Sequence, residues 1–209
     1  MKIFAAIALL STSVIAACGS SPEPTYFALS PTQSAAQSGG PHLVKIRKPG
    51  LAGYLDRASI VKRVVDNRLR ISTDEQWAEP LGDMFGRVLA QDLGTRLPGS
   101  LFYTEDGAIG VDPNSLVEVN VQRLDIGDDG DVVLLAQVAV VVATSHAPPL
   151  SKSITLRAKP KSGDTQAVVA AASSVVGQLS DVVASMLRAA PTPPPPSLSS
   201  STDLASDSR

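Results

Sequence analysis

Two stretches of the chain repeat apolar residues at the spacing of three and four that places them on one face of an α-helix. The first stretch carries Leu81, Met84, Phe85, Val88, Leu89 and Leu93, and the second carries Val168, Ala171, Val175, Leu179, Val182, Val183 and Met186. We therefore expect two amphipathic helices. Thr73 or Asp74 is the expected N-terminal cap of the first helix, and Asp164 or Thr165 that of the second, because their side chains can accept a backbone hydrogen bond.

The region between these helices changes to the alternation of apolar and polar residues that is typical of a half-buried β-strand. Val117, Val119 and Val121 alternate with polar residues, and the alternation resumes in another phase at Leu124 and Ile126, which predicts a β-bulge. Further strands are predicted at 132–144 and around 154–157. Residues 116–159 should therefore form an antiparallel meander covered by the helices near 81–93 and 168–187.

Shorter apolar runs predict additional strands nearer the N-terminus. They cover 26–29, 43–46 and a hairpin with arms at 60–65 and 69–72, whose turn lies near Asp66-Asn67. Taken together, the pattern predicts an α+β fold with a mainly antiparallel sheet and two principal helices packed on one face.

The first seventeen residues have the order of parts of a secretory signal peptide. Lys2 provides a positive charge, residues 3–10 are apolar, and residues 11–17 become smaller. A membrane-spanning helix needs roughly 20 predominantly apolar residues, and this run is shorter. We therefore expect residues 1–17 to be removed during export.

The end of this segment, Val14-Ile15-Ala16-Ala17-Cys18, resembles the lipobox of bacterial lipoproteins. The resemblance implies cleavage between Ala17 and Cys18, diacylglycerol on the Cys18 sulfur, and an acyl chain such as palmitate on the new amino terminus. Two or three acyl chains would anchor the protein stably, whereas one anchors it marginally. Gly19 follows the cysteine in place of the Asp that usually signals inner-membrane retention, so the resemblance implies the periplasmic face of the outer membrane. An ordinary signal peptide with an incidental cysteine is the alternative.

These features divide the chain into four parts. Residues 1–17 form the signal peptide, 18–25 the acylated tether, 26–190 the folded domain, and 191–209 a disordered tail rich in Pro and Ser. The tail should have polyproline character at 193–196, where a spacer is the more common role.

Composition and charge argue against several classes of function. The net charge of −2 provides no broad positive field, so nucleic acid is not an expected partner. His42 and His146 lie in predicted loops and the Gly-x-Ser-x-Gly motif is absent from the sequence, so we expect no catalytic triad and no enzyme. Asp125, Asp128, Asp129 and Asp131 lie around two glycines, but their spacing fits a hairpin turn better than a calcium loop. No metal or cofactor is expected.

Several ordered blocks in the middle of the chain carry a second resemblance. They are Gly53-Tyr54-Leu55-Asp56-Arg57, Ile60-Val61-Lys62-Arg63, Trp77-Ala78-Glu79-Pro80-Leu81, Arg87-Val88-Leu89-Ala90-Gln91-Asp92-Leu93 and Leu97-Pro98. They are similar to the PqiC family, the auxiliary lipoproteins of ABC-type intermembrane transport systems. Gln76 departs from the family, where Arg often precedes the Trp. The resemblance implies a periplasm-spanning MCE-domain protein as partner and a link to lipid traffic and envelope integrity. It also allows that several copies of this chain assemble into a homo-oligomer.

Tyr54, Leu55, Asp56, Arg57 and Trp77 are the candidate interaction residues within these blocks. Aromatic residues and Arg concentrate binding energy at protein interfaces. The same aromatic and apolar residues could instead belong to the core, and the charged residues could form local ion pairs. The leading function is docking in a transport complex, and the alternative is a stand-alone structural or assembly lipoprotein of the cell envelope.

Overall fold

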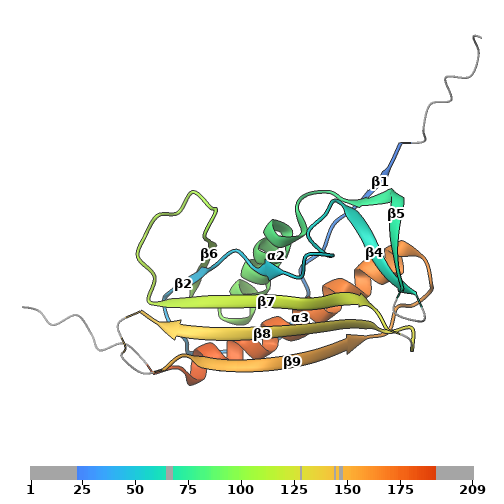
Figure 1. Ribbon diagram of the computed structural model, residues 1–209. Coiled ribbons are helices and arrows are strands. Elements are labelled where there is room, and N and C mark those ends of the chain that lie inside the picture. The colour runs from blue at the N-terminus through green and yellow to red at the C-terminus, as the bar shows by residue number, and fades with distance from the viewer. Residues whose placement is uncertain (1–22, 65–67, 128, 144, 146–147, 192–209) are drawn as a thin grey trace, which may run out of the picture.

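The part of the chain that the structure describes folds into two β-sheets and two long helices (Figure 1). The computed structural model describes residues 23–64, 68–127, 129–143, 145 and 148–191. In chain order the elements are β1 Thr25–Phe27, β2 Leu43–Ile46, β3 Gly50–Leu51, β4 Ser59–Val64, β5 Arg68–Trp77, α2 Leu81–Arg96, β6 Leu101–Thr104, β7 Ser115–Ile126, β8 Val132–Val142, β9 Leu150–Ala158 and α3 Thr165–Ala189. The predictions for residues 1–22, 192–209, Asp66-Asn67, Asp128 and His146 lie outside the described residues.

The larger sheet has the strand order β6-β2-β7-β8-β9, with β3 also beside β7. Strands β7, β8 and β9 pair antiparallel along most of their lengths, which confirms the predicted meander. The register of β7 against β8 shifts between Val121 and Arg123, so the predicted bulge is also confirmed. The turn from β7 to β8 is closed by Gly127 and Asp131, with the Gly127 N–H donating to the Asp131 carbonyl at 2.6 Å, as expected of a hairpin.

The prediction of an α+β fold with a mainly antiparallel sheet is confirmed, although the sheets also contain short parallel pairs and are not purely antiparallel. β2 is parallel to both β6 and β7, β3 is parallel to β7, and β1 is parallel to β5. Parallel neighbours need a crossover between them, and α2 lies within the one that joins β2 to β6. These partners are far apart in sequence and leave no local turn signal, so the hydrophobic pattern could not indicate their direction.

One apolar core lies between the larger sheet and the helices. Alternate residues of β8, including Leu134, Ala136 and Val138, are buried on the helix side. α3 packs along β8 and β9, while α2 packs against α3 and β6. By length and composition α3 could cross a membrane, with a mean hydropathy of 1.6, but 67% of that stretch is buried in the fold. α3 therefore serves as the core helix of this domain.

The two helices begin differently. Asp164 caps α3 as predicted, its Oδ1 accepting from the Ala167 N–H at 2.8 Å. The predicted cap of α2 was wrong, because Thr73 and Asp74 lie inside β5, which continues to Trp77. α2 instead starts after Pro80, a residue whose ring fixes a backbone angle compatible with a helix start and whose side chain accepts no capping bond.

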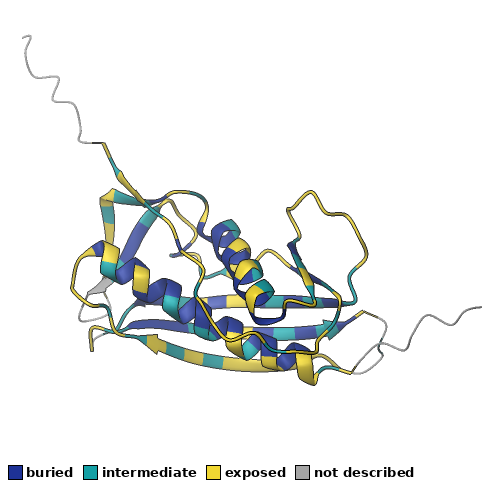
Figure 2. Ribbon diagram, turned by 180° about the vertical axis from the view of Figure 1, so that it is seen from behind, coloured by how far each residue is buried: buried dark blue, intermediate teal, exposed yellow. Residues whose placement is uncertain are grey.

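The smaller sheet has the order β1-β5-β4 and lies at one end of the molecule (Figures 1 and 2). β4 and β5 form the predicted antiparallel hairpin. Lys62 on β4 donates to the hydroxyl of Thr165, the first residue of α3, at 2.6 Å, and Glu75 on β5 accepts from that hydroxyl. These bonds fasten the smaller sheet to the start of α3.

Residues 28–38, which we call the strap, connect β1 to the loop before β2 and cross the helices on the side away from the larger sheet (Figure 2). The Ser30 N–H donates to Ser173 on α3 at 3.0 Å, and the Gln37 N–H donates to the carbonyl of Arg96 on α2 at 2.7 Å. The strap therefore covers both helices with polar contacts rather than with another helix.

Candidate interaction surfaces

The residues proposed from the sequence as an interaction surface separate into buried and exposed groups. Leu55 is 3% exposed and Trp77 is 9% exposed, so both belong to the core. Asp56 and Arg57, in the turn between β3 and β4, are exposed. The prediction of Leu55 and Trp77 as surface residues is therefore corrected, because their large apolar groups fill the core next to β1 and β4.

Tyr54 fixes this turn to the larger sheet. Its hydroxyl donates to Asp125 Oδ2 on β7 at 2.8 Å, and Arg123 Nε donates to Asp125 Oδ1 at 2.7 Å. The Asp125 side chain is fully buried, so its charge is satisfied by these directed bonds. Tyr54 thus holds the turn in place, and Asp56 and Arg57 project from it into solvent.

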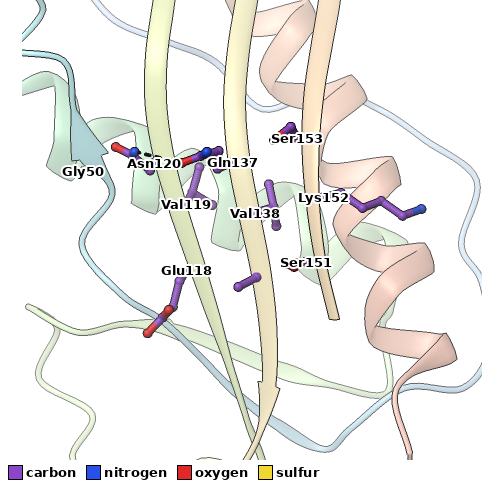
Figure 3. A pocket seen from close by; sticks show the side chains of 10 residues that line it. Gly50, Glu118, Val119, Asn120, Gln137, Val138, Ser151, Lys152 and Ser153 are labelled. Carbon is purple, nitrogen blue, oxygen red and sulfur yellow. Dashed lines mark hydrogen bonds between the residues drawn. The ribbon is translucent and has the colours of Figure 1, made fainter. Parts of the chain in front are cut away.

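A shallow groove of about 670 Å³ crosses the face of the larger sheet that the helices leave open (Figure 3). Asn120 on β7, Gln137 on β8, and Ser151 and Ser153 on β9 supply amides and hydroxyls to its wall. Asn120 Nδ2 donates to Gln137 Oε1 at 3.3 Å. The strand alternation predicts a polar side for these strands, but it contains no signal for a groove on that side.

The loop between β6 and β7 forms a second exposed region, which sequence reasoning missed. Ile109 and Val111 in this loop are 42% and 46% exposed. Tyr103 on β6 holds the loop, its hydroxyl donating to the Val111 carbonyl at 2.7 Å. Burial, followed by the nearby charge of Asp112, raises the pKa of Tyr103 above its usual range, so the hydroxyl stays protonated and continues to donate. Figures 1 and 2 place this loop at the end opposite β1 and β5.

The most deeply buried charges lie under the strap. Arg96 is 1% exposed and bonds through Nε to Asp181 Oδ1 at 2.5 Å and through Nη2 to the Gly177 carbonyl at 2.9 Å. Its other neighbour, Asp92, accepts from the Thr32 N–H at 2.6 Å. Burial raises the pKa of Asp92, although the bond from Thr32 and the charge of Arg96 oppose this shift. These groups hold the strap to both helices and do not open to any groove described above.

The described residues considered from the sequence as metal ligands or catalytic groups lie in separate places. Within the described ranges, His, Cys, Asp and Glu form no group of three or more that could hold a metal ion. His42 is exposed in the loop before β2, where its backbone carbonyl accepts from the Leu101 N–H. Asp129 forms an ion pair with Arg157 at 2.6 Å instead of converging with Asp125.

The sequence of this domain matches a family model over residues 27–184, which is most of the chain. That model describes the ABC-type transport auxiliary lipoprotein component. The chain belongs to this family. The resemblance seen in the ordered blocks is therefore confirmed. The family to which this auxiliary lipoprotein belongs consists of components of ABC-type transport systems.

Solved structures share the fold of the auxiliary lipoprotein. An uncharacterized protein is 19% identical with a TM-score of 0.64, and the match covers 78% of this chain and 98% of that chain. Protein XCC0632 from Xanthomonas campestris is 18% identical with a TM-score of 0.59, and the match covers 78% of this chain and 95% of that chain. Among curated proteins, no sequence matches the auxiliary lipoprotein significantly.

Proposed function

We propose that this auxiliary lipoprotein is anchored by acyl chains on Cys18 to the periplasmic face of the outer membrane. There it docks to the periplasm-spanning MCE-domain subunit of an ABC-type lipid transport system. The family match over residues 27–184 is the observation that carries the proposal. The lipobox from Val14 to Cys18 supports the anchor, and Gly19 after the cysteine supports the outer membrane.

The exposed regions supply the means of docking. The turn with Asp56 and Arg57 is fixed by Tyr54, and the loop with Ile109 and Val111 is fixed by Tyr103. A surface that is rigid before binding loses less conformational entropy when a partner binds. Arg57 offers a cation and Ile109 offers apolar area at separate places on the surface, and each suits a protein partner with matched chemistry.

The anchor is tested by replacing Cys18 with Ala and fractionating cells. The variant should leave the membrane fraction or remain unprocessed, while the wild-type mature chain should carry the mass of its acyl groups. An unmodified wild-type mature chain would remove the lipid anchor from the proposal.

Docking is tested by purifying the tagged full-length protein from detergent-solubilised envelopes and identifying what accompanies it. An MCE-domain protein should co-purify, and Arg57→Glu or Ile109→Glu should lower its yield. Ala170→Glu is the control, because Ala170 is also exposed but lies on α3. If the wild-type protein brings no MCE-domain protein from envelopes that contain one, the docking proposal fails in favour of a structural lipoprotein.

A further inference from the structure

The smaller sheet exposes large apolar side chains at the end of the molecule from which the chain leads towards Cys18. Tyr26 on β1 is 61% exposed, and Leu69 and Ile71 on β5 are 38% and 46% exposed. Both views place β1 and β5 at the extremity of the fold (Figures 1 and 2). Tyr26 pairs with Gln76, five positions along β5 from Ile71, so these side chains are spread over the same end of the fold. Large apolar side chains exposed at one end of a domain suit a contact with another molecule or a membrane.

The length of chain before β1 limits how far this end can lie from the anchor. Thr25, the first residue of β1, follows Cys18 by seven positions. An extended chain spans at most about 3.6 Å per residue, so Thr25 would lie within about 25 Å of the lipid-bearing cysteine in any conformation of the tether. This step rests on the proposed acylation of Cys18, and it places the smaller sheet, rather than the β6–β7 loop, beside the bilayer.

The side chains of β5 suit the region of lipid headgroups. Arg70 lies between Leu69 and Ile71 in the sequence and points to the opposite face of β5, where it is exposed and none of the described acids forms an ion pair with it. Apolar residues enter the boundary between headgroups and acyl chains, arginine binds phosphate, and tyrosine concentrates at membrane interfaces. Lys159 and Lys161 are exposed in the loop that leads to α3, whose first residue is bonded to Lys62 of the hairpin.

We propose that the exposed end of the smaller sheet, with Tyr26, Leu69 and Ile71 and with Arg70 on the other face of β5, rests in the headgroup layer of the phospholipid bilayer that anchors the chain. The acyl chains then fix the position of the domain, and the sheet fixes its orientation. In this orientation the loop with Ile109 points away from the membrane, where a periplasm-spanning partner can reach it.

The test places a tryptophan at each end of the mature full-length chain and measures quenching by brominated phosphatidylcholine. The chain is coupled through Cys18, its single cysteine, to a maleimide lipid in the vesicles, so the result does not depend on acylation in cells. Ile71→Trp is the reporter and Ile109→Trp is the matched control, since the two isoleucines are 46% and 42% exposed. The native Trp77, 9% exposed, supplies the baseline in the unsubstituted chain.

We expect Ile71→Trp to lose roughly half of its added emission, because interfacial elements enter a bilayer by several ångströms, and Ile109→Trp to lose almost none. A second reporter, Tyr26→Trp, should be quenched as well, and adding Leu69→Glu should reduce that quenching. Circular dichroism checks that each variant is folded. Equal quenching at Ile71 and Ile109, or none at either, overturns the proposal, and so does burial of Ile71 in a contact between two copies, detected by sedimentation. These three outcomes leave the co-purification test untouched, because that test measures docking to the MCE-domain protein and not contact with the bilayer.

Discussion

The two sides of the domain differ in how their polar groups are used. On the helix side, under the strap, Arg96 and Asp92 of α2 are almost fully buried and bind the strap through directed bonds. On the open side, which is the uncovered face of the larger sheet, Asn120, Gln137 and Ser153 line a shallow groove and remain accessible (Figure 3). The polar groups of the helix side hold the fold together, whereas those of the open side are available for contact with another molecule.

This difference indicates where substitutions should affect stability and where they should affect binding. A buried charge that loses its partner has a large free-energy cost, because neither water nor another group replaces the lost bonds. Exposed polar groups exchange their bonds for water at little cost. Substitutions on the helix side should therefore lower the free energy of unfolding, and substitutions on the open side should leave it unchanged.

Arg96→Met should have the largest effect on stability. The variant leaves Asp92 buried without its cation, and removal of one partner of a buried pair lowers the free energy of unfolding by about 3 to 5 kcal/mol. Arg47→Met is the control, since Arg47 is half exposed in its ion pair with Glu118, and it should cost less than about 1 kcal/mol. Urea unfolding of both variants measures the difference. Equal losses of stability would show that the buried charges of the helix side stabilise the fold no more than exposed ones do.

Two glycine substitutions should change stability in opposite directions. A Cβ added at Gly177 on α3 would overlap the side chain of Thr32 in the strap, so Gly177→Ala should destabilise by about 1 to 3 kcal/mol. Gly94 on α2 has no atom within 4 Å of the added Cβ, so Gly94→Ala should stabilise by up to about 1 kcal/mol. Thermal unfolding distinguishes them, and stabilisation by both would mean that the strap does not lie on Gly177 in solution.

Acidification should weaken the attachment of the smaller sheet to α3. Burial alone would raise the pKa of Glu75, but bonds from Thr165, Lys62 and Ser72 outweigh it and lower that pKa below the usual 4.5. A lowered pKa means that the carboxylate stabilises the fold above about pH 4.5 and loses this contribution as the pH falls through its folded pKa. The stability difference between the wild type and Glu75→Gln should therefore shrink between pH 6 and pH 3 in urea titrations. A difference independent of pH would exclude this role.

Gln137→Ala should have the smallest effect on folding. Its amide lies in the open groove and makes only a weak bond to Asn120 at 3.3 Å, so the free energy of unfolding should change by less than about 0.5 kcal/mol. A loss above about 1 kcal/mol would place the groove among the structural elements of the domain.

The sequence predicted elements whose signals are local. The alternation around Val117 to Val121 specified a strand and its bulge, and Asp164 specified the start of α3. The start of α2 was misplaced because Thr73 and Asp74 have the residue types of a cap but belong to β5, where pairing with β4 decides the conformation. Capping propensity is a local preference that tertiary pairing overrides.

The candidate site was predicted less completely, because exposure depends on contacts between distant segments. The hydrogen bond from Tyr54 to Asp125 could not be predicted, because the two residues are seventy-one positions apart. The burial of Trp77 could not be predicted without knowing that β5 pairs with β1. The strap offered no periodic pattern at all, since its bonds to Asp92 and Ser173 use single polar residues. Asp56 and Arg57 are exposed, as charged residues usually are, and their part in an interface remains a prediction.

The central claim, that this auxiliary lipoprotein acts by docking through its open surfaces, is tested most directly by photo-crosslinking in intact cells. A photoreactive amino acid is placed singly at Arg57, Ile109 and Gln137, and at Ala170 as an exposed control on α3. We predict that at least one of the first three positions captures an MCE-domain protein and that Ala170 does not. Capture at Ala170 alone, or at none of the four positions while the protein is anchored and present at its native level, would contradict the account.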